Sequence, residues 1–167
     1  MVKIEDIARF IVLRLLQRGN SISHLKLQKL LYYLQAWVMV HFDRAKIFEN
    51  TPEAWVNGPV YREIYEIYRY KNLHSGFEEK DVVSNGMSLE DSLMELKEKM
   101  GLDEKLYQFI ESFLNHYGSM TEDYLVFLSH SQQPWKDARK DLKDFQYSGN
   151  RISLDSMYEY YSKSIKG

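Results

Sequence analysis

The residue types that most often carry out catalysis or bind metals are sparse in this chain. Cysteine is absent, which excludes disulfides, thiolate metal sites and cysteine nucleophiles. The histidines occur at His24, His41, His74, His116 and His130. No two of them are three or four residues apart, the spacing that places two metal ligands on one face of a helix. We therefore expect no metal site and no bound cofactor.

The sequence also lacks the short motifs of the common enzyme classes. It contains no glycine-rich phosphate loop, no GxSxG nucleophile elbow and no GxGxxG dinucleotide motif. The adjacent carboxylates Glu78-Glu79 and Asp103-Glu104 lie in polar stretches, as is typical of a solvated surface or of a helix N-terminus. We therefore expect a protein that is not an enzyme.

The distribution of charge gives little support to binding of nucleic acids. Lys plus Arg total 22 and Asp plus Glu total 24, so the formal net charge is −2. Arg62, Arg69 and Lys71 stand among four tyrosines and could form a stacking patch that contacts phosphates. Glu63 and Glu66 in the same short segment cancel most of that charge. We expect no nucleic-acid partner and no field that draws the protein to a membrane.

The length of the chain predicts a single domain that spans residues 1–167. The longest uncharged stretch near the N-terminus has 13 residues, from Leu30 to Phe42, whereas a membrane-spanning helix needs about 20. The first six residues are charged and periodic, unlike a signal peptide. We therefore expect a cytoplasmic protein without a membrane segment.

Hydrophobic periodicity predicts a mainly α fold, a compact helical bundle. Apolar residues repeat with helical spacing, and capping residues separate the repeats. The expected N-terminal caps are Ser21 or Ser23, Ser88, Asp103 and Ser119, and Gly101 should end a helix. The expected helices cover residues 4–18, 23–42, 59–70, 88–101, 103–118, 119–128, 134–142 and 153–165. The second helix is apolar on most sides, so it should lie at the centre of the bundle, with only Lys26 and Lys29 in solvent.

The pattern also predicts a small two-stranded β element. Residues 54–56 have the composition of a short strand. Asn85-Gly86 favours a tight turn, so we expect residues 81–83 to form the strand that pairs with 54–56. The segment Asn57-Gly58-Pro59 should turn the chain, with Pro59 at the first position of the following helix.

Three segments, taken in order and with their spacing, resemble a known family. They are KLQKLLYY at residues 26–33, EAWVNGPV at residues 53–60 leading into Tyr65, and SHSQQPWKDAR at residues 129–139. The set is similar to the Panacea-domain family, the SocA-like antitoxins, also described as GepA-like phage-associated proteins. The closing Ile152-Ser153-Leu154, with Tyr160-Tyr161 after it, also resembles the end of that family's domain.

The resemblance implies a mostly helical domain encoded on prophages, other mobile elements and bacterial chromosomes. It implies an antitoxin whose gene often adjoins a toxin gene, and which neutralises its cognate protein toxin through protein–protein contact. Because the domain pairs with many unrelated toxins, the resemblance does not identify the target. An alternative from a different class is an adaptor that delivers a partner to a protease system, or a regulator of its own operon. The oligomeric state stays open.

The polar motif residues of the central helix allow two interpretations. Gln28, Tyr32 and Gln35 lie within about 60° of one another beside its apolar stripe. They could form a satisfied polar seam that hydrogen-bonds the loop of Trp55 or the loop of His130. Alternatively, they could line a groove that holds a partner.

The remaining motif residues also have a structural and a binding interpretation. We expect Gly58 and Pro59 to form a turn rather than a contact. Trp135, directly after Pro134, should anchor a helix start in the core, although a binding role stays open.

The best candidate surface for a protein partner is the helix after Pro59. Tyr61, Tyr65 and Tyr68 share one face, and Arg62 and Arg69 border it, a mixture of residues that concentrates binding energy in protein interfaces. Three phenols on one face need three hydrogen-bond outlets, which favours an interface. The alternative is that this tyrosine row belongs to the core.

Overall fold

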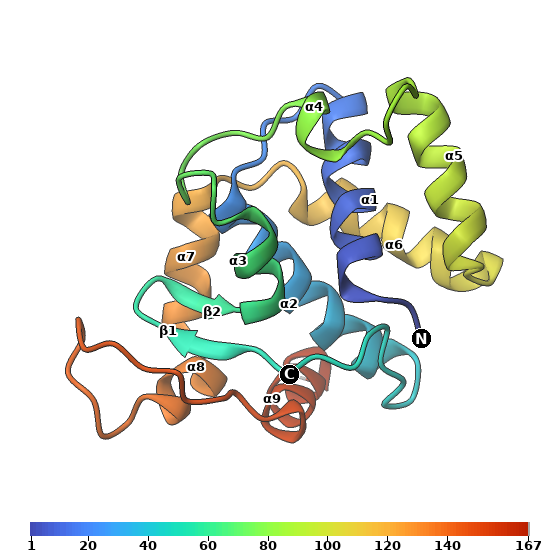
Figure 1. Cartoon of the computed structure of the whole chain (residues 1–167). Helices are drawn as coiled ribbons and strands as arrows, with labels where there is room; N and C mark the ends of the chain where they lie inside the picture. Colours follow the sequence, from blue (N-terminus) through green and yellow to red (C-terminus); the bar gives the residue numbers. More distant parts are fainter. Residues whose placement is uncertain (167) are drawn as a thin grey trace.

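The computed structural model describes residues 1–166 and confirms a mainly α fold with a small antiparallel sheet (Figure 1). The described elements are α1 (Ile4–Gln17), α2 (His24–His41), β1 (Glu53–Trp55), β2 (Gly58–Val60), α3 (Arg62–Tyr68), α4 (Glu79–Val82), α5 (Leu89–Met100), α6 (Glu104–Tyr117), α7 (Glu122–Ser131), α8 (Gln133–Ala138) and α9 (Leu154–Lys166). No helix among these is long and apolar enough to cross a lipid bilayer.

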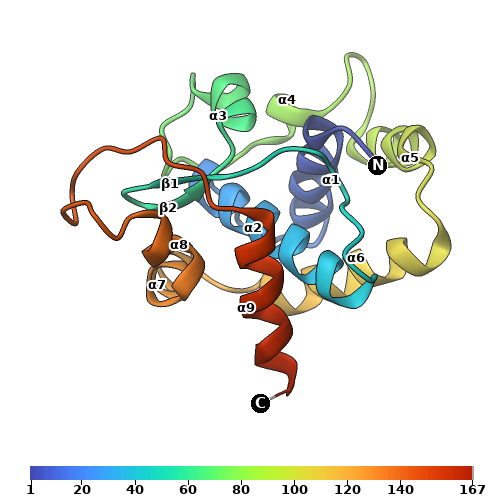
Figure 2. The ribbon, with the colours of Figure 1, turned by 90° about the horizontal axis from the view of Figure 1, so that it is seen from below.

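Helix α2 is the centre of the fold, as its sequence predicts. It contacts α1, α6, α7 and α9, and all but three of its 18 residues are buried. Figures 1 and 2 show it running between α1 on one side and α7 on the other. Its first turn is capped by Ser23, whose side chain accepts a hydrogen bond from the backbone N–H of Lys26.

The expectation that Lys26 and Lys29 face solvent is wrong. Lys26 is 6% exposed and Lys29 is fully buried. Both ammonium groups reach backbone carbonyls of other segments, as described below, and these hydrogen bonds offset part of the cost of removing the two groups from water. A helix that is buried on every side therefore tolerates two lysines.

The predicted caps of the later helices agree with the structure, with two corrections. Ser88 and Asp103 cap α5 and α6, and Gly101 ends α5 in a left-handed conformation at φ 56°. Helix α7 is capped by Thr121 rather than by Ser119, because the Thr121 hydroxyl accepts from a backbone N–H of the first turn. Helix α8 ends at Ala138, four residues earlier than expected.

The small sheet exists, but its predicted pairing is wrong. Strand β1 pairs with β2, the segment directly after the turn, and residues 79–82 form the short helix α4 instead. Pro59 therefore lies within β2 and not at a helix start; α3 begins at Arg62. The outer edge of β1 is covered as well, because residues 150–152 bond to it through the Ala54 N–H and the Pro52 carbonyl.

Candidate partner-binding site

The β1–β2 hairpin is held in place by side chains from α8 and from the residue that follows it, which bond to the hairpin backbone. The indole N–H of Trp135 donates to the Trp55 carbonyl at 2.8 Å. The guanidinium of Arg139, which is 5% exposed, donates to the Ala54 carbonyl at 2.9 Å. Trp135 is partly buried, so its expected role as an anchor at a helix start agrees with its position, and Pro134 beside it is buried at the start of α8.

Lys29 of α2 also bonds to the hairpin backbone, on strand β2. Its Nζ donates to the Pro59 carbonyl at 2.9 Å, and its aliphatic stem passes directly beneath Gly58. Burial lowers the pKa of the Lys29 ammonium to about 7, and the carboxylate of Glu122 opposes that shift. Position 58 has φ 106°, in the region that favours glycine.

His130 of α7 completes the support. Its ring stacks on Trp135 with 4.0 Å between centroids and 12° between planes. Burial, and then the charge of Lys29, lower the pKa of the imidazole. The first, second and third motif segments thus meet at the hairpin, which the sequence order alone does not reveal.

The polar residues of α2 form a satisfied seam, as the first of the two interpretations predicts. Gln28 brackets Tyr61: its Oε1 accepts from the Tyr61 N–H at 2.7 Å and its Nε2 donates to the Tyr61 carbonyl at 3.3 Å. Gln35 makes a similar pair of hydrogen bonds to the segment before the hairpin. It accepts from the Ile47 N–H at 2.9 Å and donates to the Phe48 carbonyl at 2.7 Å. The expected connection that holds Trp55 is therefore a partner of Gln35. Gln28 instead holds the residue directly after the hairpin, and neither amide bonds to the loop of His130.

Tyr32, the third member of this seam, contacts the C-terminal helix α9. Its hydroxyl shares a hydrogen bond with the hydroxyl of Tyr161 on α9 at 3.2 Å. The Tyr161 hydroxyl also lies 2.6 Å from Gln132 Oε1, as does the hydroxyl of Tyr33. Burial raises the pKa of Tyr32 above its usual value, which keeps this phenol neutral.

Above the supported hairpin, four large side chains gather at the surface. Trp55 and Tyr65 meet edge to face with 4.9 Å between ring centroids, and the ring of Tyr147 lies 6.3 Å from that of Trp55. Arg62 donates to both carboxylate oxygens of Glu53, at 2.9 and 2.8 Å, and to the Tyr147 hydroxyl at 3.1 Å. We call Trp55, Arg62, Tyr65 and Tyr147 the hairpin surface.

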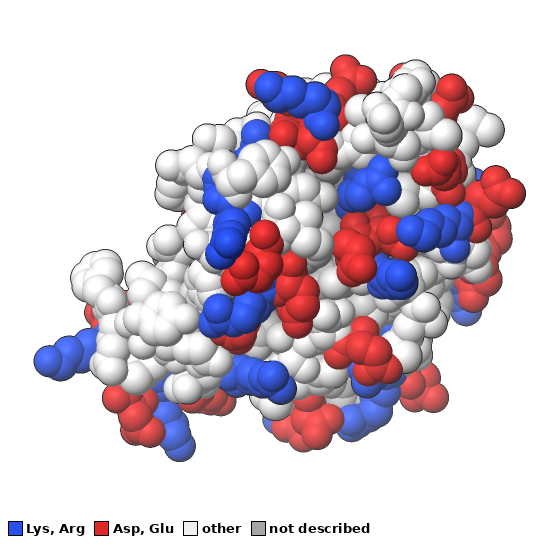
Figure 3. Space-filling model, in the orientation of Figure 1, with Lys and Arg blue, Asp and Glu red and all other residues white. Residues whose placement is uncertain are grey.

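Figure 3 shows the setting of the hairpin surface. An uncharged stretch of surface lies over the hairpin and the adjoining part of the loop between α8 and α9, and acidic and basic side chains border it. Since aromatic residues and arginine dominate the energetics of protein interfaces, the hairpin surface has the composition of a contact site for another protein.

The tyrosine row expected on α3 does not exist as a surface. Tyr61 is fully buried against Phe48, and Tyr68 is 4% exposed and packs on Phe77. The core interpretation is correct for these two residues, because the helix turns this face inward. Tyr65 and Arg62 remain at the surface, where their partners from other segments, Trp55 and Tyr147, could not be found by helical periodicity.

Arg69 and His24 lie beside this site but not on it. Arg69 is exposed at the end of α3, where it pairs with Glu66 at 3.2 Å, and partner binding by Arg69 stays a prediction. His24 is buried beneath Tyr65, with 5.9 Å between the stacked rings. Burial lowers the pKa of His24 to about 4.

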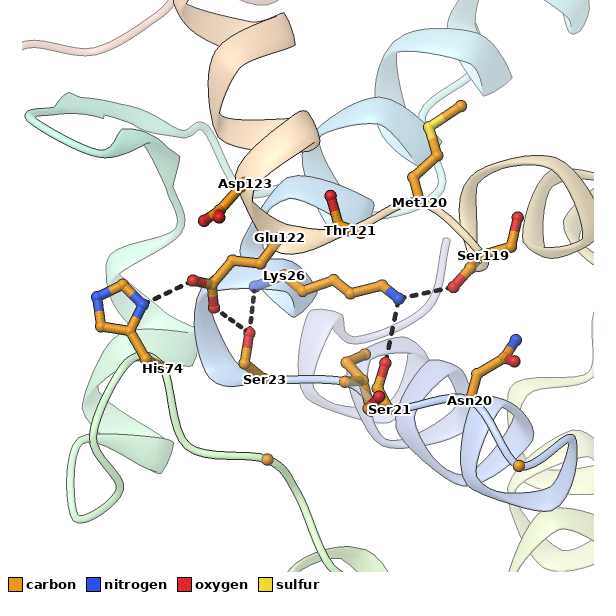
Figure 4. Close-up of a pocket in the computed structure, with 14 residues that line it drawn as sticks. Asn20, Ser21, Ser23, Lys26, His74, Ser119, Met120, Thr121, Glu122 and Asp123 are labelled. Carbon is orange, nitrogen blue, oxygen red and sulfur yellow. Dashed lines mark hydrogen bonds and ion pairs between the residues drawn. The ribbon is translucent and has the colours of Figure 1, made fainter.

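A shallow hollow of about 600 Å³ lies between the α1–α2 turn and the α6–α7 turn (Figure 4). Lys26 crosses its floor and donates to the Gly118 carbonyl at 2.6 Å and the Ser21 carbonyl at 3.1 Å. Glu122 accepts from the Ser23 hydroxyl and contacts the His74 Nδ1 at 2.6 Å. These polar groups are paired with one another across the hollow. Among residues 1–166, no three His, Asp or Glu side chains come together as a metal site.

The family model for the antitoxin SocA-like Panacea domain matches residues 27–136, more than half of the chain. The protein belongs to the SocA-like, Panacea-domain family of antitoxins. The matched range starts in α2 and ends in α8, so it contains Lys29, the whole hairpin, His130 and Trp135. Tyr147 and Arg139 lie beyond it. No curated protein and no solved structure matches the chain significantly.

Proposed function

We propose that this protein is a cytoplasmic antitoxin that neutralises a cognate protein toxin by binding it directly, without catalysis. Membership of the SocA-like family supports the antitoxin role. The observation that carries direct binding is the hairpin surface: aromatic and arginine side chains at the surface of a hairpin whose backbone is bonded to α2 and α8.

The rigidity of the hairpin favours binding because little conformational freedom is lost when the partner docks. Side chains that are already fixed cost less entropy on association than side chains on a mobile loop. A contact of ordinary size buries about 800 Å² on each partner and depends on a few aromatic and arginine residues near its centre. The hairpin surface provides such a centre with Trp55, Arg62 and Tyr65.

The decisive experiment uses the gene next to the one that encodes this protein. Induced alone, that gene should arrest bacterial growth; induced together with this protein, it should not. A tagged form of this protein should then purify in a stable complex with the neighbouring gene product. A neighbour that is not toxic, or a rescue with no complex, contradicts the proposal.

The same strains separate neutralisation by binding from delivery to a protease. An adaptor needs the protease, so its rescue is lost in protease-deficient cells, and the toxin level falls when the adaptor is present in wild-type cells. An antitoxin that acts by occlusion rescues both strains equally and leaves the toxin level unchanged or higher. We expect the second result.

A further inference from the structure

The loop between α8 and α9 carries the most exposed large apolar side chain in the described part of the chain. Phe145 is 88% exposed, and Tyr147 two residues later is 68% exposed. A single exposed apolar residue on a mobile loop needs no explanation. Phe145 differs because the loop around it is held in one conformation.

The conformation of this loop is set by Arg139. Arg139 is 5% exposed. Its guanidinium donates to the Ala54 carbonyl of the hairpin and to three carbonyls of the loop, those of Lys143, Asp144 and Gln146, at 3.1, 3.4 and 2.6 Å. A buried guanidinium is stable only when its donors are satisfied, so these hydrogen bonds tie the loop to the hairpin.

Further hydrogen bonds fix the turn in the middle of the loop and join its two ends. The Gln146 side chain accepts from the Lys143 N–H at 3.2 Å, and the Gln146 N–H donates to the Lys143 carbonyl at 3.0 Å. The Asn150 side chain donates to the Ala138 carbonyl at 3.1 Å. In Figures 1 and 2 the loop projects from the body of the molecule on the side of the hairpin, opposite α5.

We propose that residues 140–148 form a preorganised docking arm that inserts the Phe145 ring into an apolar pocket of the toxin. The arm is continuous with the hairpin surface, because the Tyr147 hydroxyl accepts from Arg62 and the Tyr147 ring packs near Trp55. Arg139 is its positioning residue and acts through the loop. The proposal rests on the proposed function and names the contact by which it works.

The charge of the arm favours a protein over a nucleic acid or an anionic membrane. Lys140 and Lys143 are balanced by Asp141 and Asp144 within the same loop, and Arg62 beside it is paired with Glu53. A polyanion or an anionic lipid surface is bound by an excess of basic residues, which this arm does not have. An exposed phenyl ring on a fixed, electrically balanced loop suits an apolar pocket in a folded protein.

The test uses the purified toxin whose growth arrest this protein relieves. Its Kd is measured for the wild type and for three variants of the full chain. Phe145→Ala should weaken binding about 30-fold or more, because it removes an anchor. Its Tm should equal that of the wild type, since the ring contributes little to the fold. Met94→Ala on α5, which removes a side chain that is 69% exposed, is the matched control and should leave Kd unchanged.

Arg139→Lys tests the positioning role with a readout that needs no toxin. Lysine keeps the charge but cannot reach four carbonyls at once, so backbone amides of residues 140–148 should exchange hydrogen faster, and binding should weaken at least about 5-fold. Phe145→Ala should leave that exchange unchanged.

The possible results distinguish failure of the docking-arm proposal from failure of the proposed antitoxin function. If the wild type binds the toxin tightly and Phe145→Ala binds it with the same Kd, the docking-arm proposal is wrong and the proposed antitoxin function is unaffected. A wild type that binds no toxin overturns both. Binding of a single-stranded RNA by the wild type that Phe145→Ala abolishes assigns the loop to nucleic acid and overturns the proposal as stated.

Discussion

Gly58 lies so close to Lys29 that a Cβ at position 58 would be 2.6 Å from the Lys29 Cε. The same Cβ would be 2.8 Å from the Ser129 Oγ. The hairpin, α2 and α7 therefore meet at a point where a Cβ fits only if the Lys29 stem and the Ser129 hydroxyl move. This contact brings together one residue from each of the three motif segments, at residues 26–33, 53–60 and 129–139.

Gly58→Ala should lower the free energy of unfolding by about 3 kcal/mol. About half of this comes from placing a side chain at φ 106°, and the rest from displacing the Lys29 stem. Denaturant unfolding measures the loss. Gly19→Ala is the control, because Gly19 also has positive φ (77°) but has open space around it. Equal losses for the two variants would mean that the hairpin moves away without cost.

Lys29→Met should change how stability depends on pH. The pKa of Lys29 is lowered to about 7 in the folded protein, so the unfolded chain binds the extra proton between that pH and its ordinary pKa near 10.5. The wild type therefore gains stability as the pH rises through this window, and Lys29→Met does not. The advantage of Lys29→Met over the wild type in unfolding free energy should therefore be greatest near neutral pH and should decrease as the pH rises.

The measurement compares the unfolding free energies of the two proteins at about pH 6.5 and about pH 9.5. The advantage of Lys29→Met over the wild type should shrink by roughly 3 kcal/mol between them. Taking the difference cancels the titration of the other groups. A difference that is constant with pH would show that Lys29 stays protonated in the folded protein across the whole range.

His24 should stay neutral down to about pH 4, with its proton on Nδ1. Gln28 donates through its amide nitrogen to the Tyr61 carbonyl and faces the His24 Nε2 at 3.2 Å, so that ring nitrogen accepts. Because the folded pKa lies below the ordinary value of 6.5, the wild type loses stability as the pH falls from about 6.5 towards about 4. Nitrogen NMR shifts of the imidazole report the tautomer directly; a proton on Nε2 at neutral pH would contradict the assignment.

Helical periodicity predicted most of the fold because apolar spacing and caps are local features. Helix α2 was placed at the centre, its cap was narrowed to Ser21 or Ser23, and Ser88 and Asp103 were identified as caps, from neighbours within a few residues. The pairing of β1 was predicted wrongly because the Asn85-Gly86 signal outweighed the simpler hairpin around Asn57. Short strands carry too few residues for their pattern to choose a partner.

The site was predicted less well because it depends on contacts between distant segments. A lysine such as Lys29 predicts a surface position. Its burial depends on the hydrogen bond to the Pro59 carbonyl, which the sequence does not reveal. Tyr61 and Tyr68 have the spacing of a row, but which face of a short helix turns inward is decided by α2 and not by α3 itself. Phe145 and Tyr147 carried one overlooked signal: two large aromatic residues in an otherwise polar loop.

Leu31→Ala should cost about 2–5 kcal/mol of unfolding free energy, because it leaves a cavity at a fully buried position of α2. Leu34→Ala should behave alike, since Leu34 is equally buried. Chemical denaturation measures both, and Met94→Ala on the exposed face of α5 should cost less than about 0.5 kcal/mol. A loss below about 1 kcal/mol at Leu31 would place α2 at the periphery.

The central claim, that the hairpin surface binds the toxin, is tested most directly by comparing two tyrosines on the same helix. The measurement is the Kd of the purified toxin for Tyr65→Ala and for Tyr68→Ala, with the Tm of each. Tyr65→Ala should weaken binding about 10-fold or more while its Tm stays within a few degrees of the wild type. Tyr68→Ala should lower the Tm by several degrees and leave the Kd of the folded protein unchanged. Wild-type affinity in Tyr65→Ala, with folding intact, would contradict the account.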